Sequence, residues 1–350
     1  MKDSEPKSVD FPAIPYPWQQ AEWQRVLDQH LADKLPHALL FAGQQGLGKS
    51  HLAQALGQYL LCHSPRSGLA CGECRACQLN RADTHPDFKL IRPEEAGKAI
   101  KIDQIRSLAE YVSKTSQQGG YKVVIIEPAE AMNINAANAL LKSLEEPAGN
   151  TLIVLVSHVP SAVMPTVRSR CQTLTLLTPS KDLALPWLAA MASDDRAESL
   201  LQFADGAPLA ALALLNGDLL EQRQGFQSTL SEVALGQVSP LEAAKKFLDL
   251  DTLELMDWLI AWVHGIACYL NAKDSGRGQT PEASLLPLLE GLDPTLLYRY
   301  LDKIMMSKRQ LLSSANPNKQ LLLEEILMDW RALARLSYGR ARQARANELP

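Results

Sequence analysis

Gly43-Gln44-Gln45-Gly46-Leu47-Gly48-Lys49-Ser50 matches the pattern G-x-x-x-x-G-K-[ST], and this stretch decides the fold of the first half of the chain. An apolar run at 37–42 precedes it and predicts a buried strand, and residues 52–61 predict a helix. Glycines let backbone N–H groups surround phosphate oxygens at the positive end of the helix dipole. We therefore expect these residues to bind a nucleotide, with Lys49 on the β- and γ-phosphates and Ser50 on Mg²⁺.

The end of a second predicted strand, at 121–126, departs from what hydrolysis needs. In a P-loop enzyme this strand ends in an acidic pair, in which one carboxylate holds the metal and the next polarises water. Here it ends in Glu127-Pro128, and a proline cannot act as a base. The sequence predicts a site that holds ATP or ADP with Mg²⁺ and cleaves ATP poorly. A vestigial loop that binds nothing is the alternative.

Short apolar runs alternate with helical patterns through the first half of the chain, which predicts an α/β fold with a parallel, doubly wound sheet. Strand signals end at Thr178-Pro179-Ser180, and only helical patterns follow. We expect a nucleotide-binding domain at 1–178, a small helical domain at 179–223 and an all-α bundle at 224–350. The predicted strands lie at 37–42, 88–91, 121–126, 151–156 and 173–177.

Composition excludes several classes of protein. The chain has 350 residues, 46% of them hydrophobic, and a net charge of −4, so it lacks the overall positive charge of a nucleic-acid-binding protein. The first residues carry no apolar signal sequence, and no uncharged apolar stretch reaches membrane-spanning length. We expect a cytoplasmic protein.

Four of the six cysteines are clustered: Cys62, Cys71, Cys74 and Cys77. In a reducing compartment disulfides are a weak explanation, and four thiolates at short spacing suit tetrahedral Zn²⁺. An iron–sulfur cluster also uses C-x₂-C-x₂-C, although the further cysteine and proline of the ferredoxin pattern are missing. A cluster without metal is the third possibility. We expect Cys171 and Cys268 to be ordinary buried thiols.

These motifs, in this order, resemble bacterial clamp-loader subunits of the AAA+ class over about residues 15–215. The resemblance extends to Asn138-Ala139-Leu140-Leu141-Lys142-Ser143-Leu144-Glu145-Glu146-Pro147 and to Ser169-Arg170-Cys171. Within the class, Thr84-His85-Pro86-Asp87-Phe88 and Tyr16-Pro17-Trp18 are similar to the delta-prime branch. We interpret Glu145 and Glu146 as residues that cap a helix end and face solvent or a neighbour.

The resemblance implies a mechanical subunit. A second catalytic group is missing, because Leu209 stands where ATPase members of the class place an arginine in the small helical domain. The resemblance implies that Arg170 is an arginine finger that acts in trans. Without the resemblance, the default interpretation of Arg170 is a residue of a surface salt bridge. It implies partners, namely the motor (gamma/tau) and delta subunits and, indirectly, the sliding clamp and primed DNA, in a hetero-oligomer without membrane contact. The chain is then part of a polymerase holoenzyme, with no polymerase activity of its own.

Two other functions stay open at this point. One is an active ATPase motor, which an acid at 128 and an arginine near 209 would have supported. The other is a zinc-ribbon DNA-binding module on a vestigial AAA+ domain, for which only Arg66, Arg75 and Arg81 stand near the cysteines.

Overall fold

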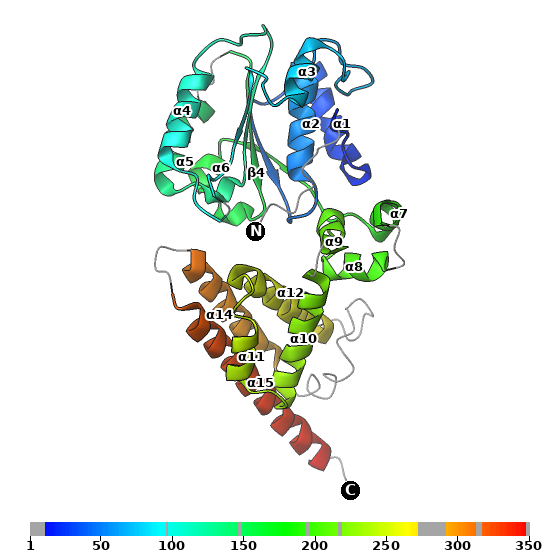
Figure 1. Ribbon diagram of the computed structural model, residues 1–350, viewed down its shortest axis with the longest axis vertical. Coiled ribbons are helices and arrows are strands. Elements are labelled where there is room, and N and C mark those ends of the chain that lie inside the picture. The colour runs from blue at the N-terminus through cyan, green and yellow to red at the C-terminus, as the bar shows by residue number, and fades with distance from the viewer. Residues whose placement is uncertain are drawn as a thin grey trace. The chain divides into compact units, whose positions relative to one another are not determined.

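A parallel sheet and the helices around it lie in the first of two compact units, Met1–Asn216 and Gly217–Pro350. The computed structural model in Figure 1 describes residues 11–95, 97–145, 149–192, 196–215, 219–271, 292–312 and 317–347. Glu146, which we expected to cap a helix end, lies outside these residues.

Five parallel strands form the sheet in the order β2-β3-β4-β1-β5. The strand that leads into the phosphate loop, β1, lies between β4 and β5, and the register pairs its last residue, Ala42, with Ser157. The carboxyl ends of β1, β3 and β4 therefore meet at one edge. The strands are β1 (Ala38–Ala42), β2 (Phe88–Ile91), β3 (Lys122–Ile126), β4 (Thr151–Ser157) and β5 (Gln172–Thr175).

Helices cover both faces of the sheet, which explains why its central strands are apolar on both sides. Side chains such as Phe41 and Val154 pack with α1 and α2, and Leu40 and Ile153 pack with α4, α5 and α6. Figure 1 shows the two helical layers on either side of β4. The helices and short 3₁₀ turns of this part are η1 (Pro17–Gln19), α1 (Gln20–Leu31), α2 (Lys49–Leu61), α3 (Arg75–Arg81), α4 (Ile102–Val112), η2 (Ala129–Ala131), α5 (Ile134–Glu145), η3 (Pro160–Ala162) and α6 (Pro165–Arg168).

Three helices complete the first unit and pack on one another: α7 (Lys181–Ala192), α8 (Ala197–Phe203) and α9 (Pro208–Leu215). Helix α9 begins at a proline. Proline suits the first helical turn because the backbone N–H that it lacks would have no carbonyl acceptor within the helix there. The next helix, α10, runs from Leu219 to Leu235, so the boundary expected at residue 223 falls inside a helix. The division between the two compact units falls instead between residues 216 and 217.

The second unit is helical throughout its described residues. Trp330 lies at its centre, fully buried, where its Nε1 donates to the carbonyl of Leu230 at 2.9 Å. Its ring packs against Trp262 and Tyr300, with ring centroids 5.0 and 5.9 Å away. The helices are α10 (Leu219–Leu235), α11 (Pro240–Lys246), α12 (Thr252–Asn271), α14 (Pro294–Leu312) and α15 (Lys319–Asn347).

Helix α12 is the one helix of the described residues that is long and apolar enough to cross a membrane, with a mean hydropathy of 1.3. Its side chains at Leu255, Leu259 and Val263 are buried in the core of the second unit. Glu254 and Asp257 interrupt its apolar sequence, so this helix is not an uncharged apolar stretch of membrane-spanning length.

The predicted fold class is confirmed: a parallel α/β sheet precedes an all-helical region. The prediction that both isolated cysteines are buried is wrong. Cys268 is exposed and Cys171 is half-buried. The position of Cys268 on α12 turns its side chain away from the face that carries Val263 and Ala267.

We expect Trp330→Ala to destabilise the protein by about 3–5 kcal/mol, because it empties the centre of this core and removes a buried hydrogen bond. Met306→Ala is the matched control, since Met306 is 60% exposed on α14 and should cost little. Chemical denaturation followed by circular dichroism measures both. Equal midpoints for the two variants would contradict this account of the core.

Candidate functional site

The phosphate loop connects β1 to α2, and the ammonium group of its lysine bonds to carbonyls of the loop itself. Gly48 adopts a left-handed conformation (φ 78°) immediately before the helix. The Lys49 ammonium donates to the carbonyls of Gly43 at 2.8 Å and Gln44 at 2.5 Å, and its side chain is buried. These carbonyls accept the hydrogen bonds that Lys49 would otherwise donate to a bound phosphate. The predicted loop residues are therefore together, in the expected context of strand, loop and helix.

The carboxylate next to the loop already has partners. Glu127 follows β3, is 6% exposed, and accepts a hydrogen bond from the Ser50 hydroxyl. Its other oxygen accepts from the Arg92 guanidinium at 2.9 and 3.3 Å. Ser50, which is expected to bind Mg²⁺, thus contacts a carboxylate, and an arginine neutralises that carboxylate. A magnesium ion that bound Glu127 would have to compete with Arg92. The sequence did not reveal this pairing of Arg92 with Glu127.

Helix α9, one of the three helices that complete the first unit, contacts the phosphate loop directly. The backbone N–H of Leu209 donates to the carbonyl of Gly46 at 3.1 Å, and a Cβ at Gly46 would lie 2.6 Å from that of Ala210. The Leu209 side chain, which stands at the position of the missing arginine, is 8% exposed. This position therefore presents an apolar side chain and a backbone donor to the loop, and no charge.

Polar groups that sequence analysis missed lie at the carboxyl end of β4. Glu130 accepts backbone N–H bonds from His158 at 2.8 Å and Val159 at 3.1 Å. Burial, and then the charge of Lys49, lower the pKa of His158 to about 4, so its ring is neutral at physiological pH. Glu130 lies three residues after Glu127, a spacing that could have indicated it. Its carboxylate holds the turn that follows β4.

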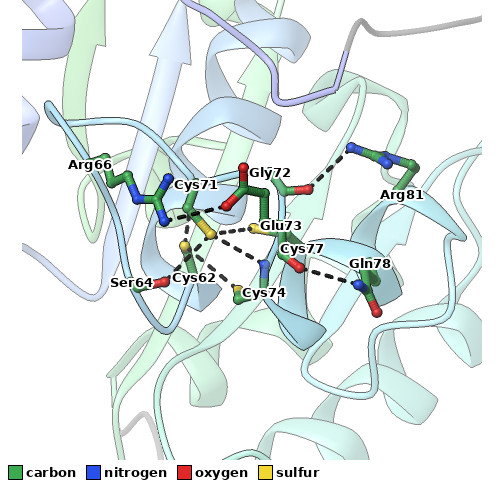
Figure 2. Close-up of polar contacts among 10 residues, drawn as sticks. All are labelled: Cys62, Ser64, Arg66, Cys71, Gly72, Glu73, Cys74, Cys77, Gln78 and Arg81. Carbon is green, nitrogen blue, oxygen red and sulfur yellow. Dashed lines mark hydrogen bonds and ion pairs between the residues drawn. The ribbon is translucent and has the colours of Figure 1, made fainter.

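The four clustered cysteines converge on one point, shown in Figure 2. Cys62 follows α2, Cys74 precedes α3 and Cys77 lies inside α3, while Gly72 turns the chain between them with φ 77°. All four Sγ atoms lie within 4.8 Å of one another. The Sγ atoms of Cys62 and Cys74 are 3.9 Å apart, and those of Cys71 and Cys77 are 3.8 Å apart. Sulfurs about 2.3 Å from a central tetrahedral Zn²⁺ lie about 3.8 Å apart, so the cluster fits this ion.

The surroundings of the sulfurs favour a thiolate at Cys71 and disfavour one at Cys77. The Ser64 hydroxyl and the backbone N–H groups of Glu73 and Cys74 donate to Cys71 and lower the pKa of its thiol to about 5. Burial raises the pKa of the Cys77 thiol, so a thiolate there is costly without a compensating charge. A divalent cation supplies that charge, and binding it releases protons.

Arg170 lies just after α6 and is paired within its own chain. Its Nε donates to Glu145 at 2.6 Å and its Nη1 donates to the carbonyl of Thr166 at 2.9 Å. The side chains of Arg170 and Glu145 are 35% and 50% exposed. The sequence expectation that Glu145 faces solvent or a neighbour left out this ion pair, which joins the end of α5 to the start of β5.

Two family models match the chain. One, described as "DNA polymerase III, delta subunit", matches residues 18–180, and one described as its C-terminal part matches residues 217–332. The delta-prime subunit of DNA polymerase III from Pseudomonas aeruginosa is 40% identical over 91% of this chain and 98% of its own length. The delta-prime subunit from Escherichia coli is 32% identical, over 89% of this chain and 94% of its own.

A solved structure is also similar. A gamma-subunit-related protein of DNA polymerase III from Thermotoga maritima aligns with 89% of this chain and 100% of its own, at 20% identity and a TM-score of 0.44.

Proposed function

This chain belongs to the delta-prime subunits of DNA polymerase III, which are clamp-loader subunits, and from that premise we propose that it supplies Arg170 in trans to the ATP site of a neighbouring motor subunit. The proposal rests on a contrast between the chain's own nucleotide site and its surface arginine. The chain's own site lacks hydrolytic groups, while an exposed guanidinium lies on its surface. In this role the subunit is a rigid member of a ring that places the sliding clamp on primed DNA.

The chain's own nucleotide site supports the first half of this contrast. Pro128 removes the water-polarising carboxylate, Leu209 removes the cationic contact to the γ-phosphate, and Arg92 neutralises Glu127. The intact loop still offers its N–H groups and Lys49 to ADP or ATP. We infer that nucleotide binds and is turned over little.

The pairing of Arg170 with Glu145 supports the second half. An exposed ion pair contributes only about 0–1 kcal/mol, so exchanging Glu145 for a γ-phosphate costs little. The guanidinium is planar and permanently charged, which suits the charge that spreads over phosphoryl oxygens in the transition state. The pair with Glu145 keeps the side chain ordered until a neighbour arrives.

For the cysteine cluster we propose one structural Zn²⁺ per chain. All four positions of a tetrahedral site are filled by protein, so none is left for a reacting water. The zinc-ribbon DNA-binding alternative rests on three arginines near the cysteines, and one of them is engaged. Arg81 lies over the Phe11 ring and donates to the Gly72 carbonyl, whereas Arg66 makes only an exposed ion pair with Glu73, at 3.3 Å.

We also propose the roles of the remaining parts. Residues 1–178 are the nucleotide-binding domain, helices α7, α8 and α9 the lid, and the second unit, from α10 on, the helical collar that joins the motor (gamma/tau) and delta subunits. The protein then acts in the cytoplasm as part of a hetero-oligomer.

Arg170→Ala should leave folding, zinc content and assembly intact and should lower clamp-stimulated ATP hydrolysis by the reconstituted loader. An arginine finger contributes about 10³–10⁵ in rate at the one site it serves, and the other sites of the loader dilute this loss. Arg170→Lys should rescue only in part, because an ammonium lacks the guanidinium geometry. Clamp loading and steady-state ATPase assays measure the effect.

Arg168→Ala is the matched control, since Arg168 lies two residues away and is exposed, and its guanidinium donates to the carbonyl of Pro160. It should behave as wild type. Unchanged rates for Arg170→Ala, in loaders whose assembly is confirmed, would leave this chain as a scaffold without a finger.

The isolated chain should bind ATP with Mg²⁺ in calorimetry, should lose that binding on Lys49→Ala, and should hydrolyse ATP near background. Lys34→Ala, at an exposed lysine before β1, should change nothing. Robust turnover that Lys49→Ala abolishes would make the chain a motor. Absence of any binding heat would show the loop to be vestigial.

Elemental analysis should find one zinc and no iron per chain. Cys74→Ser should lose the zinc and make residues 62–80 protease-sensitive while the second unit survives, because structural zinc contributes folding free energy locally. Cys268→Ser removes an exposed thiol outside the cluster and should keep the metal. Zinc retained by Cys74→Ser would contradict the ligand set.

A further inference from the structure

Residues 11–19, called the strap from here on, begin on the cysteine cluster. The Phe11 ring packs against Cys62, Ala70 and Cys77. The Arg81 guanidinium covers the same ring, 4.9 Å from its centroid. The next residue, Pro12, lies beside Gly72, where an added Cβ would be in van der Waals contact with the proline Cδ, at 3.4 Å. The start of the strap therefore rests on the segment that zinc would order.

The middle of the strap runs along α2, the helix that joins the phosphate loop to the cysteine cluster. The Ala13 N–H donates to the Gln58 side chain at 2.8 Å, near the end of the helix. The His51 Nε2 donates to the carbonyl of Ile14 at 2.7 Å, near the start of the helix. The chain thus spans α2 from one end to the other.

The end of the strap holds the phosphate loop through its carbonyls. Gln19, fully buried, donates to the carbonyls of Leu47 at 2.8 Å and Gly48 at 2.9 Å. The Trp18 indole N–H donates to the Leu47 carbonyl as well, at 3.0 Å. In a planar trans peptide the C=O and the following N–H point in opposite directions. Fixing these carbonyls therefore fixes the N–H groups of Gly48 and Lys49.

We propose that the strap couples the cysteine cluster to the nucleotide site, with Trp18 and Gln19 as positioning residues that hold the phosphate loop ready for phosphate. The inference rests on the zinc site proposed above. Without zinc the segment under Phe11 loosens, so the ring loses its packing surface and the strap frays from its first residue. Gln19 and Trp18 then hold the loop less firmly, and the loop amides become mobile although no ligand has left the loop.

Hydrogen exchange on the full chain tests the coupling without relying on activity. Chelating zinc should speed exchange of the loop amides at 43–50 several-fold, and Phe11→Ala should do the same with zinc in place. Ile14→Ala is the matched control. Its side chain is 58% exposed and only its backbone carbonyl holds α2, so exchange at the loop should stay at the wild-type level.

The two changes should not add. In Phe11→Ala the strap is already released, so chelation should cause no further change at 43–50, while Phe11→Tyr should restore the response to zinc. Gln19→Glu keeps the acceptor for the Tyr16 N–H and loses the donor to both loop carbonyls. It should weaken ATP binding in calorimetry and speed loop exchange without loss of zinc.

The outcomes separate this inference from the zinc proposal. A chain that binds no zinc overturns both. A chain whose chelation exposes residues 62–80 and leaves 43–50 unchanged keeps the zinc site and overturns the coupling. So does a Phe11→Ala variant whose loop exchanges at the wild-type rate, or whose response to chelation is undiminished.

Discussion

Three glycines of the phosphate loop set how closely the rest of the first unit can approach it. A Cβ would lie 2.5 Å from the Leu176 carbonyl oxygen at Gly43, 2.6 Å from Ala210 at Gly46, and 2.7 Å from the Tyr16 ring at Gly48. These contacts come from the end of the sheet, the lid and the strap. The conformational freedom that suits glycine to a phosphate also lets three distant segments meet on one turn.

Sequence reasoning recovered what is local. The strands and the loop were predicted because apolar runs and a spaced motif are written in consecutive residues, and each strand lies where it was expected. The cysteine cluster was predictable for the same reason, since thiols at short spacing can reach one ion. Membership of the clamp-loader subunits is likewise confirmed.

What the sequence did not reveal depends on side chains brought together from far along the chain. Arg92 and Glu127 are 35 residues apart, and their pairing follows only from β2 lying beside β3. The pair of Arg170 with Glu145 depends in the same way on how α5 meets α6. The exposure of Cys268 depends on which face of α12 packs inward, and the apolar composition of that helix does not settle its orientation. Each of these changes the chemistry of a predicted residue without changing the fold.

The hydrogen bond from Leu209 to the Gly46 carbonyl has a consequence for assembly. It ties the lid to the loop through backbone atoms and so favours this arrangement of the two parts before any neighbour binds. A subunit that is already ordered gives up less conformational entropy when it joins a complex, and more of the contact energy remains as affinity. Here the polypeptide itself provides a bridge between lid and loop, and no ligand is needed to make it.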